Sequence, residues 1–292
     1  MSAAPLLVLG DTGLAGTAIL DAARARGLAA TGASRHGEHQ VDLCDAAALR
    51  ALLDRLSPTT VINAAAQVSV AECERDPAQA WLVNARPAAL IADAARQAQI
   101  RFVQISTDHF YTGDGRKAHR EDAPVVLLND YARSKYAAEA FALTAPDALV
   151  VRTNILGLKS ATGGSFGEWA FKLIAADGEA TLFEDQFVSI LDIWSFAEGV
   201  LDLAASDARG LINLASAEVF SKAELVEALA AALGRTLTRA KRGSVGTLEV
   251  RRPDSLGLDV TRAEAILGRR LPGLQAVAAR YAGQAAMMLA RP

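Results

Sequence analysis

Short apolar segments alternate with longer segments of helical periodicity along the first 155 residues of the chain. The expected strands are residues 5–10, 28–33, 60–64, 101–106 and 148–153, and the expected helices are residues 14–26, 46–56, 78–98 and 130–143. Apolar strands that are separated by helices are typical of a parallel sheet with both faces covered. This order predicts an α/β fold with a doubly wound, Rossmann-like parallel sheet, whose ligand site lies outside the carboxyl ends of the strands.

The alternation weakens after residue 155. There the sequence predicts a Gly/Ser/Thr-rich loop at 156–167, helices at 168–176 and 193–204, a strand at 210–214, a helix that begins with a Ser221/Glu224 capping box, and a short helix within 251–265. We therefore expect residues 1–155 to form a dinucleotide-binding domain and residues 156–292 to form mainly a smaller C-terminal substrate domain. The chain is expected to return to the sheet around residues 193–215.

A glycine-rich turn joins the first expected strand to the first helix. It reads Gly10-Asp11-Thr12-Gly13-Leu14-Ala15-Gly16, which is a GxxGxxG pattern. Glycines at this spacing allow a tight turn, a close approach of the backbone to a pyrophosphate, and close packing of helix on strand. The amide groups at the start of the helix then bind the anion. The turn predicts a dinucleotide site that includes Gly10, Thr12, Gly13, Leu14, Ala15 and Gly16.

The residues after the second strand bear on the choice of cofactor. NAD enzymes usually carry an Asp or Glu there, whereas NADP enzymes carry an Arg. This chain has Ser34 and Arg35, which can bind a 2′-phosphate, so NADP is favoured over NAD. His36 and His39 have an HxxH spacing but lack a third ligand, and no metal site is expected.

Tyr131 and Lys135 are spaced four residues apart in the helix after the fourth strand, so their side chains share one helical face. A carbonyl that accepts hydride needs a proton donor, and a phenol can be that donor when a nearby ammonium lowers its pKa. Thr107, just past the carboxyl end of the fourth strand, can polarise the same carbonyl oxygen. These three residues are the candidate catalytic set.

Three further segments fall where such a sheet lines a cofactor. They contain Asp42 and Leu43, the small residues Ala64, Ala65 and Ala66, and Asn84. Small side chains at 64–66 let a nucleotide approach the strand end closely.

Taken together, these features resemble the extended short-chain dehydrogenases, and specifically the dTDP-4-dehydrorhamnose reductase-like family of sugar-nucleotide reductases. The similar stretches are 61–66 (VINAAA), Ser106-Thr107-Asp108, Arg152-Thr153, Asp185-Gln186-Phe187, Arg252-Pro253-Asp254-Ser255 and Leu258-Asp259. The resemblance covers nearly the whole chain.

The resemblance implies a role for each matching residue. For the cofactor, the pyrophosphate would contact Gly13, Leu14 and Ala15, the adenine would contact Asp42 and Leu43, and the cofactor backbone would contact Ala64 to Ala66. Tyr131 would donate the proton, and Lys135 would bind the nicotinamide ribose. The sugar would face Thr107, Asp108, His109, Asn154 and Ile155, and the diphosphate would contact Arg252. The chain departs from the family pattern at His109, at Ile155 and in residues 187–191, all where the sugar is expected.

Composition adds the limits on partners and location. The net charge is −3, so no global positive field attracts nucleic acid or anionic membranes. No apolar run reaches the about 20 residues that a bilayer span requires. The two cysteines have no metal-ligand or disulfide spacing. We expect a soluble, cytoplasmic protein that acts alone or as a homodimer on a nucleotide sugar.

The expected function is NADPH-dependent reduction of a keto group on a nucleotide-activated sugar. One alternative is a sugar-nucleotide epimerase or dehydratase that retains NAD. The absence of an acid at His109 argues against dehydration, and Arg35 argues against a tightly held NAD. Another alternative is a non-catalytic, NADP-binding regulatory subunit, which would have no chemical reason to keep the Thr107, Tyr131 and Lys135 set.

Overall fold

The structure, a computed structural model, describes residues 5–159, 164–248 and 251–289. The chain forms two compact units, and neither is a continuous segment. The first unit comprises Met1–Thr107, Leu127–Arg152 and Ala197–Ile212, and the second comprises Asp108–Val126, Thr153–Phe196 and Asn213–Pro292.

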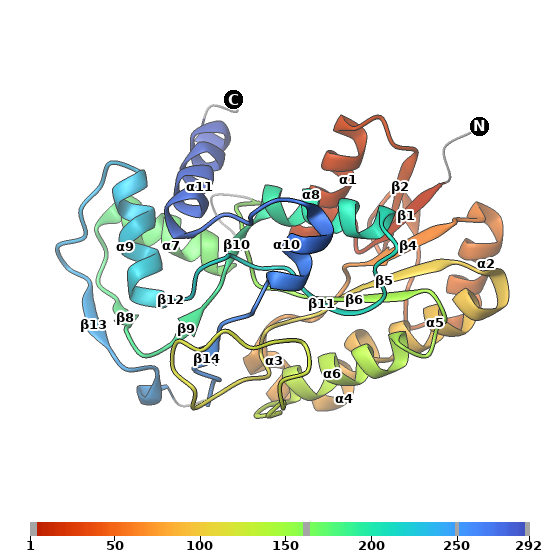
Figure 1. Ribbon diagram of the computed structural model, residues 1–292, viewed down its shortest axis with the longest axis horizontal. Helices are drawn as coiled ribbons and strands as arrows, with labels where there is room; N and C mark the ends of the chain where they lie inside the picture. The colour runs from red at the N-terminus through yellow and green to blue at the C-terminus, as the bar shows by residue number, and fades with distance from the viewer. Residues whose placement is uncertain (1–4, 160–163, 249–250, 290–292) are drawn as a thin grey trace. The chain divides into compact units, whose positions relative to one another are not determined.

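The first unit is built on a seven-stranded sheet (Figure 1). Its strands are β1 (Leu6–Leu9), β2 (Ala30–Ser34), β3 (His39–Gln40), β4 (Thr60–Asn63), β5 (Arg101–Ile105), β6 (Ala148–Arg152) and β11 (Gly210–Asn213). Their order is β11-β6-β5-β4-β1-β2-β3, and the pairs from β6 through to β3 are parallel. The order reverses at β1, which confirms the predicted doubly wound sheet and leaves a crevice at the carboxyl ends of β1 and β4.

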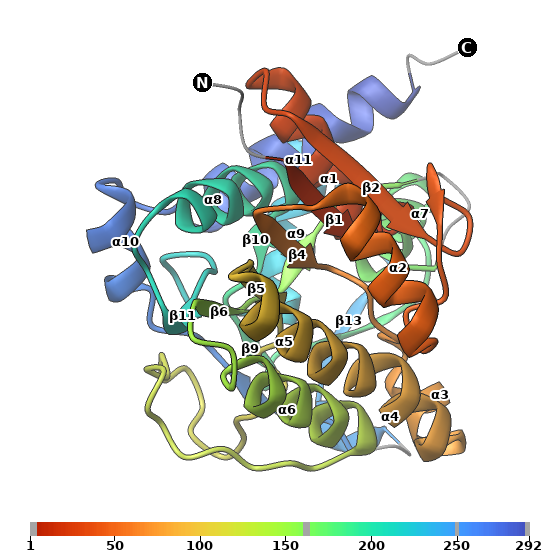
Figure 2. The same ribbon diagram turned by 90° about the vertical axis from the view of Figure 1, so that its right-hand side faces the viewer.

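Helices cover both faces of this sheet. They are α1 (Leu14–Ala25), α2 (Ala46–Leu56), α3 (Val70–Arg75), α4 (Pro77–Asn84), α5 (Arg86–Ala98), α6 (Asp130–Ala142) and the later part of α8 (Ile193–Ala205). On one face α1 lies beside α8, and Arg26 forms an ion pair with Asp202 at 2.6 Å. On the other face α5 and α6 run side by side (Figure 2). There the apolar sides of α2, α5 and α6 share one core with β1, β4, β5 and β6.

The prediction of one helix over residues 78–98 is wrong. The structure has two helices, α4 and α5, with Ala85 between them. Pro87 lies in the first turn of α5. Proline has no amide hydrogen, and its ring clashes with the carbonyl four residues earlier, so α4 ends before it.

The second unit consists of short strands packed among helices. Its strands are β7 (Ile155–Leu156), β8 (Thr181–Phe183), β9 (Phe187–Val188), β10 (Leu191–Asp192), β12 (Phe220–Ser221), β13 (Lys241–Gly243) and β14 (Ser255–Leu256), and its helices are α7 (Phe166–Ala176), α9 (Lys222–Ala232), α10 (Thr261–Leu267) and α11 (Leu274–Leu289). The core lies among α7, α9 and α11. The predicted Ser221/Glu224 capping box is confirmed. A second box, Ser165 with Glu168, starts α7 two residues before the predicted position.

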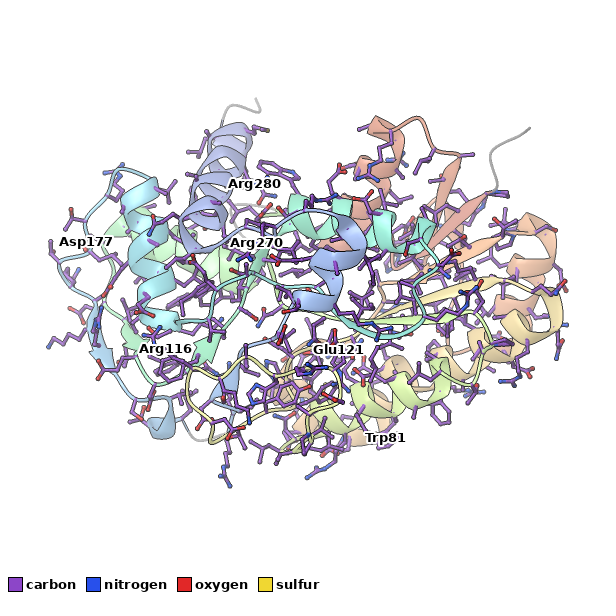
Figure 3. All side chains as sticks on the ribbon, viewed as in Figure 1. Trp81, Arg116, Glu121, Asp177, Arg270 and Arg280 are labelled. Carbon is purple, nitrogen blue, oxygen red and sulfur yellow. The ribbon has the colours of Figure 1, made fainter. Side chains whose placement is uncertain are left out.

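Residues 108–126 belong to the second unit because their side chains bind it at several points. The Arg116 guanidinium donates to Glu224 at 2.7 Å and lies over the Phe187 ring at 4.9 Å from its centroid (Figure 3). Buried His119 stacks on Tyr111 with ring centroids 4.1 Å apart. These contacts fix the path of the chain directly after Thr107.

No helix among the described residues is long and apolar enough to cross a membrane.

Candidate functional site

The glycine turn after β1 packs so closely on itself and on the segment after β4 that Gly10 and Gly16 leave no room for a side chain. Gly10 has a φ of 82°, and a Cβ there would lie 2.7 Å from the amide nitrogen of Ala65. A Cβ on Gly16 would lie 2.2 Å from the carbonyl oxygen of Gly10. Gly13 is the N-cap of α1, so no side chain covers the first amides of that helix. The turn therefore fits the pyrophosphate of a dinucleotide.

The carboxyl end of β2 faces the same turn. The hydroxyls of Thr12 and Ser34 lie 3.3 Å apart. Arg35 is exposed and forms no hydrogen bond or ion pair with any residue that the structure describes. This arrangement leaves a guanidinium available to a 2′-phosphate, which fits NADP.

Strand β3, which the sequence pattern did not reveal, places the predicted adenine residues beside β2. His39 and Gln40 pair with Ala33 and Ser34, and Asp42 follows two residues after the end of β3. Asp42 is exposed and accepts a hydrogen bond from the Cys44 amide at 2.9 Å, whereas Leu43 is buried. Among the described residues, His36 and His39 belong to no group of three metal-ligating side chains.

The small-residue segment after β4 lies against the glycine turn. The amide of Ala64 donates to Leu9 at 2.9 Å, and the amide of Ala65 donates to the Asn63 side chain at 3.2 Å. Ala66 follows and is partly exposed. These bonds hold the segment beside Gly10, and no large side chain intervenes.

Asn84, at the end of α4, ties this segment to α6. Its Oδ1 accepts from the Gln67 amide at 2.7 Å, and its Nδ2 donates to the Ser134 hydroxyl at 3.0 Å. Ser134 lies between Tyr131 and Lys135 and donates to the Tyr131 carbonyl at 3.0 Å. Asn84 therefore positions α6, and its predicted contact with the cofactor stays a prediction.

Tyr131 and Lys135 are both buried on α6, whose N-cap is Asn129. The Lys135 ammonium donates to the carbonyl of Ile105, the last residue of β5, at 2.7 Å. Thr107, two residues further on, is also buried. The structure thus brings the Lys135 side chain to the carboxyl end of β5, where Thr107 is located. Burial lowers the pKa of Lys135 to about 8.

A buried ion pair lies one turn beyond Lys135 and was not recognised from the sequence. Glu139 binds Arg152 through Nε at 2.9 Å and Nη2 at 2.7 Å, and Ser106 donates to Glu139 at 2.6 Å. Both charged side chains are at most 3% exposed. The Glu139 charge favours the protonated form of Lys135. The spacing of Tyr131, Lys135 and Glu139, four residues apart each, was the available signal.

Apart from Thr107, which ends the first segment of the first unit, the predicted substrate residues lie in the second unit, where Asp108 and Asn154 meet. Asp108 is buried and accepts a hydrogen bond from Asn154 Nδ2 at 2.6 Å. Ile155 begins β7 and is partly exposed. Arg252 is exposed.

The pKa of the side chain at position 109 is lowered by burial and by two cations. Burial, together with the cations of Lys222 and Arg252, lowers the pKa of His109 to about 3. Lys222, which the sequence reasoning missed, lies over the Phe166 ring at 3.6 Å from its centroid. Burial lowers its pKa to about 8, although Asp108 acts in the opposite direction. His109 is therefore neutral at physiological pH.

This histidine predicts a pH dependence of stability. Between pH 3 and 6.5 the unfolded chain binds a proton at His109 that the folded chain does not. The free energy of unfolding should therefore fall by about 2 kcal/mol from pH 7 to pH 5 through this residue alone. Urea denaturation at both pH values measures the change. His109→Gln should remove this part of the pH dependence. The control His36→Gln, which changes an exposed histidine, should keep it. If the unfolding free energies of both variants and the unaltered chain change equally with pH, His109 is not the residue responsible.

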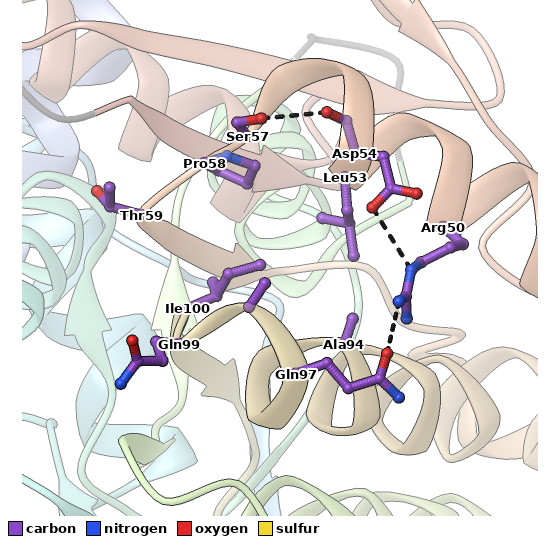
Figure 4. Close-up of a pocket in the computed structure, with 11 residues that line it drawn as sticks. Arg50, Leu53, Asp54, Ser57, Pro58, Thr59, Ala94, Gln97, Gln99 and Ile100 are labelled. Carbon is purple, nitrogen blue, oxygen red and sulfur yellow. Dashed lines mark hydrogen bonds and ion pairs between the residues drawn. The ribbon is translucent and has the colours of Figure 1, made fainter.

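A separate hollow of about 430 Å³ lies on the first unit between α2 and α5 (Figure 4). Pro58, Thr59 and Ile100, which precede β4 and β5, line it together with Arg50 and Asp54, whose side chains form an ion pair at 3.4 Å. The hollow is therefore at the amino ends of the strands, at the opposite edge of the sheet from the glycine turn, and none of the predicted site residues lines it.

Comparison with known proteins agrees with this geometry. A family model described as the RmlD substrate binding domain matches residues 4–286. The probable low-salt glycan biosynthesis reductase Agl14 of Haloferax volcanii is 29% identical over 282 residues, covering 92% of this chain and 94% of that protein. A dTDP-4-dehydrorhamnose reductase of Streptomyces griseus is 32% identical over 182 residues, covering 62% of this chain and 58% of that protein. The crystal structure of dTDP-4-dehydrorhamnose reductase from Bacillus anthracis in complex with NADP has a similar fold, with a TM-score of 0.87 at 19% identity, covering 96% of this chain and 98% of that chain.

Proposed function

Because this chain belongs to the RmlD substrate-binding-domain family, we propose that it reduces a keto group of a nucleotide-activated sugar with NADPH. The observation that carries the proposal is the Lys135 ammonium, which is bound at the carboxyl end of β5 and shares one face of α6 with Tyr131. Relatives of this chain are named as reductases of dTDP-linked keto sugars.

Each residue of the catalytic set has a distinct task. NADPH, when bound, supplies the hydride. Tyr131 donates a proton to the carbonyl oxygen, on which negative charge develops. The Thr107 hydroxyl donates a hydrogen bond to the same oxygen. The Lys135 cation stabilises the phenolate that remains on Tyr131, and it can bind the nicotinamide ribose through the protons that Ile105 does not use.

The pyrophosphate and the 2′-phosphate of the cofactor are assigned to different segments. The amides of Gly13, Leu14 and Ala15 bind the pyrophosphate at the start of α1. Ser34 and Arg35 bind the 2′-phosphate. The proposal that NADP is the cofactor is supported by the guanidinium of Arg35, which forms no ion pair within the described part of the chain.

The substrate is assigned to side chains of the second unit. Asp108 and Asn154, which bind each other at 2.6 Å, offer hydrogen-bonding groups to the sugar hydroxyls. Neutral His109 can donate or accept a hydrogen bond there. Arg252 supplies a cation for the diphosphate, and Lys222 adds a second cation in its electrostatic reach.

Spectrophotometry at 340 nm with a panel of nucleotide-activated keto sugars tests the proposal, because NADPH is consumed in the reaction. We expect oxidation of NADPH with at least one member of the panel. NAD⁺ that co-purifies with the protein and is retained through turnover would instead indicate an epimerase. Binding of NADP without oxidation across the panel would indicate a regulatory subunit.

Two further proposals concern the form of the protein in the cell. A homodimer is supported by large exposed side chains on α4 and α6, among them Trp81 and Phe141, which are 42% and 41% exposed. Sedimentation velocity that finds only monomer at micromolar concentration contradicts the dimer.

A cytoplasmic location is supported by Cys44 and Cys73, which are both thiols.

A further inference from the structure

The side chain of Asp11, in the glycine turn, packs against β2. The carboxyl end of this strand is the proposed binding place of the adenosine ribose. A Cβ on Gly32 would lie 2.5 Å from the Cβ of Asp11, and a Cβ on Gly37 would lie 2.2 Å from Asp11 Oδ2. A side chain at either position would displace the carboxylate from this place. The Asp11 side chain therefore runs across β2 and ends at the turn formed by residues 34–37.

One oxygen of this carboxylate lacks a donor. Asp11 Oδ1 is buried and has no hydrogen-bond partner within the described residues. A buried carboxylate oxygen without a donor is unfavourable, and such groups in native proteins usually serve a ligand or a bound solvent molecule.

Side chains of both charge signs lie around the turn at residues 34–37. Arg35 is its exposed cation, whereas Asp11 and Glu38 are acids. Glu38 is held close by Thr31, whose hydroxyl donates to Glu38 Oε2 at 3.3 Å. A 2′-phosphate at this turn would be attracted by one guanidinium and repelled by two carboxylates.

We propose that Asp11 is a residue that determines cofactor selectivity. Its negative charge repels the 2′-phosphate of NADP(H) and leaves the uncharged 2′-hydroxyl of NAD(H) unaffected. It thus takes the place of the acid that NAD enzymes carry at the tip of β2 and that this chain lacks there. The chain then binds both cofactors, with a preference for NADP(H) that Arg35 creates and Asp11 limits. This inference rests on the proposed use of a nicotinamide cofactor.

Isothermal titration of the full chain with NADP⁺ and NAD⁺ tests the inference without any turnover. Asp11→Asn keeps the size of the side chain and removes its charge. We expect it to tighten NADP⁺ binding by about tenfold, the effect of removing one like charge near a phosphate, and to leave NAD⁺ binding unchanged or weaker. The gain for NADP⁺ should shrink as salt is raised, because salt screens the repulsion.

The matched control is Asp54→Asn, which removes an equal charge at the opposite edge of the sheet and should leave both affinities unchanged. A ratio of the two dissociation constants that changes less than about twofold in Asp11→Asn overturns the inference. Failure of the unaltered chain to bind either dinucleotide overturns the inference and the proposed function together. If Asp11→Asn does not fold, the two dissociation constants of the unaltered chain test the inference. A preference for NADP⁺ above about a hundredfold contradicts a limiting role of Asp11.

Discussion

Tyr131→Phe should lower kcat by about 10² to 10⁴, the usual contribution of a positioned proton donor. The substitution removes only the phenol oxygen, and the ring stays in its buried place on α6. NADPH binding should be unchanged, because the glycine turn and Arg35 are untouched. Steady-state kinetics with a reactive keto sugar, together with a dissociation constant for NADPH, measures both effects.

Tyr136→Phe is the control for this variant, because it removes the same atom from the same helix at a position that is 38% exposed. Its kcat should match that of the unaltered chain. Full activity of Tyr131→Phe would exclude Tyr131 as the proton donor.

Arg152→Met should lower the free energy of unfolding by about 3–5 kcal/mol. The substitution leaves the Glu139 carboxylate buried with Ser106 as its remaining partner. An uncompensated charge in that position has a far larger cost than the loss of a contact. Urea denaturation followed by circular dichroism measures the difference in unfolding free energy.

Two further variants separate charge from packing. Arg242→Met breaks a pair with Glu227 at 2.7 Å in which both side chains are exposed, and it should cost less than about 1 kcal/mol. The double variant Arg152→Met with Glu139→Leu should regain much of the lost stability, because no buried carboxylate is left without its guanidinium. A loss below about 1 kcal/mol in Arg152→Met alone would contradict this account.

The sheet of the first unit could be predicted because its strands are apolar on both faces. β1, β4, β5 and β6 lie within their predicted ranges. β2 begins two residues after its predicted start. β3 was missed because it has only two residues, and two residues carry no periodicity.

Residues of the candidate site could be predicted only where a short sequence pattern indicates them. The glycine turn and the Tyr131/Lys135 spacing are local patterns, and their roles stay predictions. The four-residue spacing from Lys135 was a local signal for Glu139, but no local pattern reveals its pairing with Arg152. The same holds for the contact of Lys222 with Phe166. The same is true of Asp11, whose direction depends on glycines 21 and 26 residues further along the sequence, at 32 and 37.

The division of the chain into interleaved segments limits how a protein of this kind can change. The path passes between the two units after residues 107, 126, 152, 196 and 212. A fragment that stops at Arg152 lacks β11, so β6, whose five residues are all buried, becomes an open edge that invites aggregation. One transfer of a single continuous segment therefore cannot deliver either unit whole to another gene.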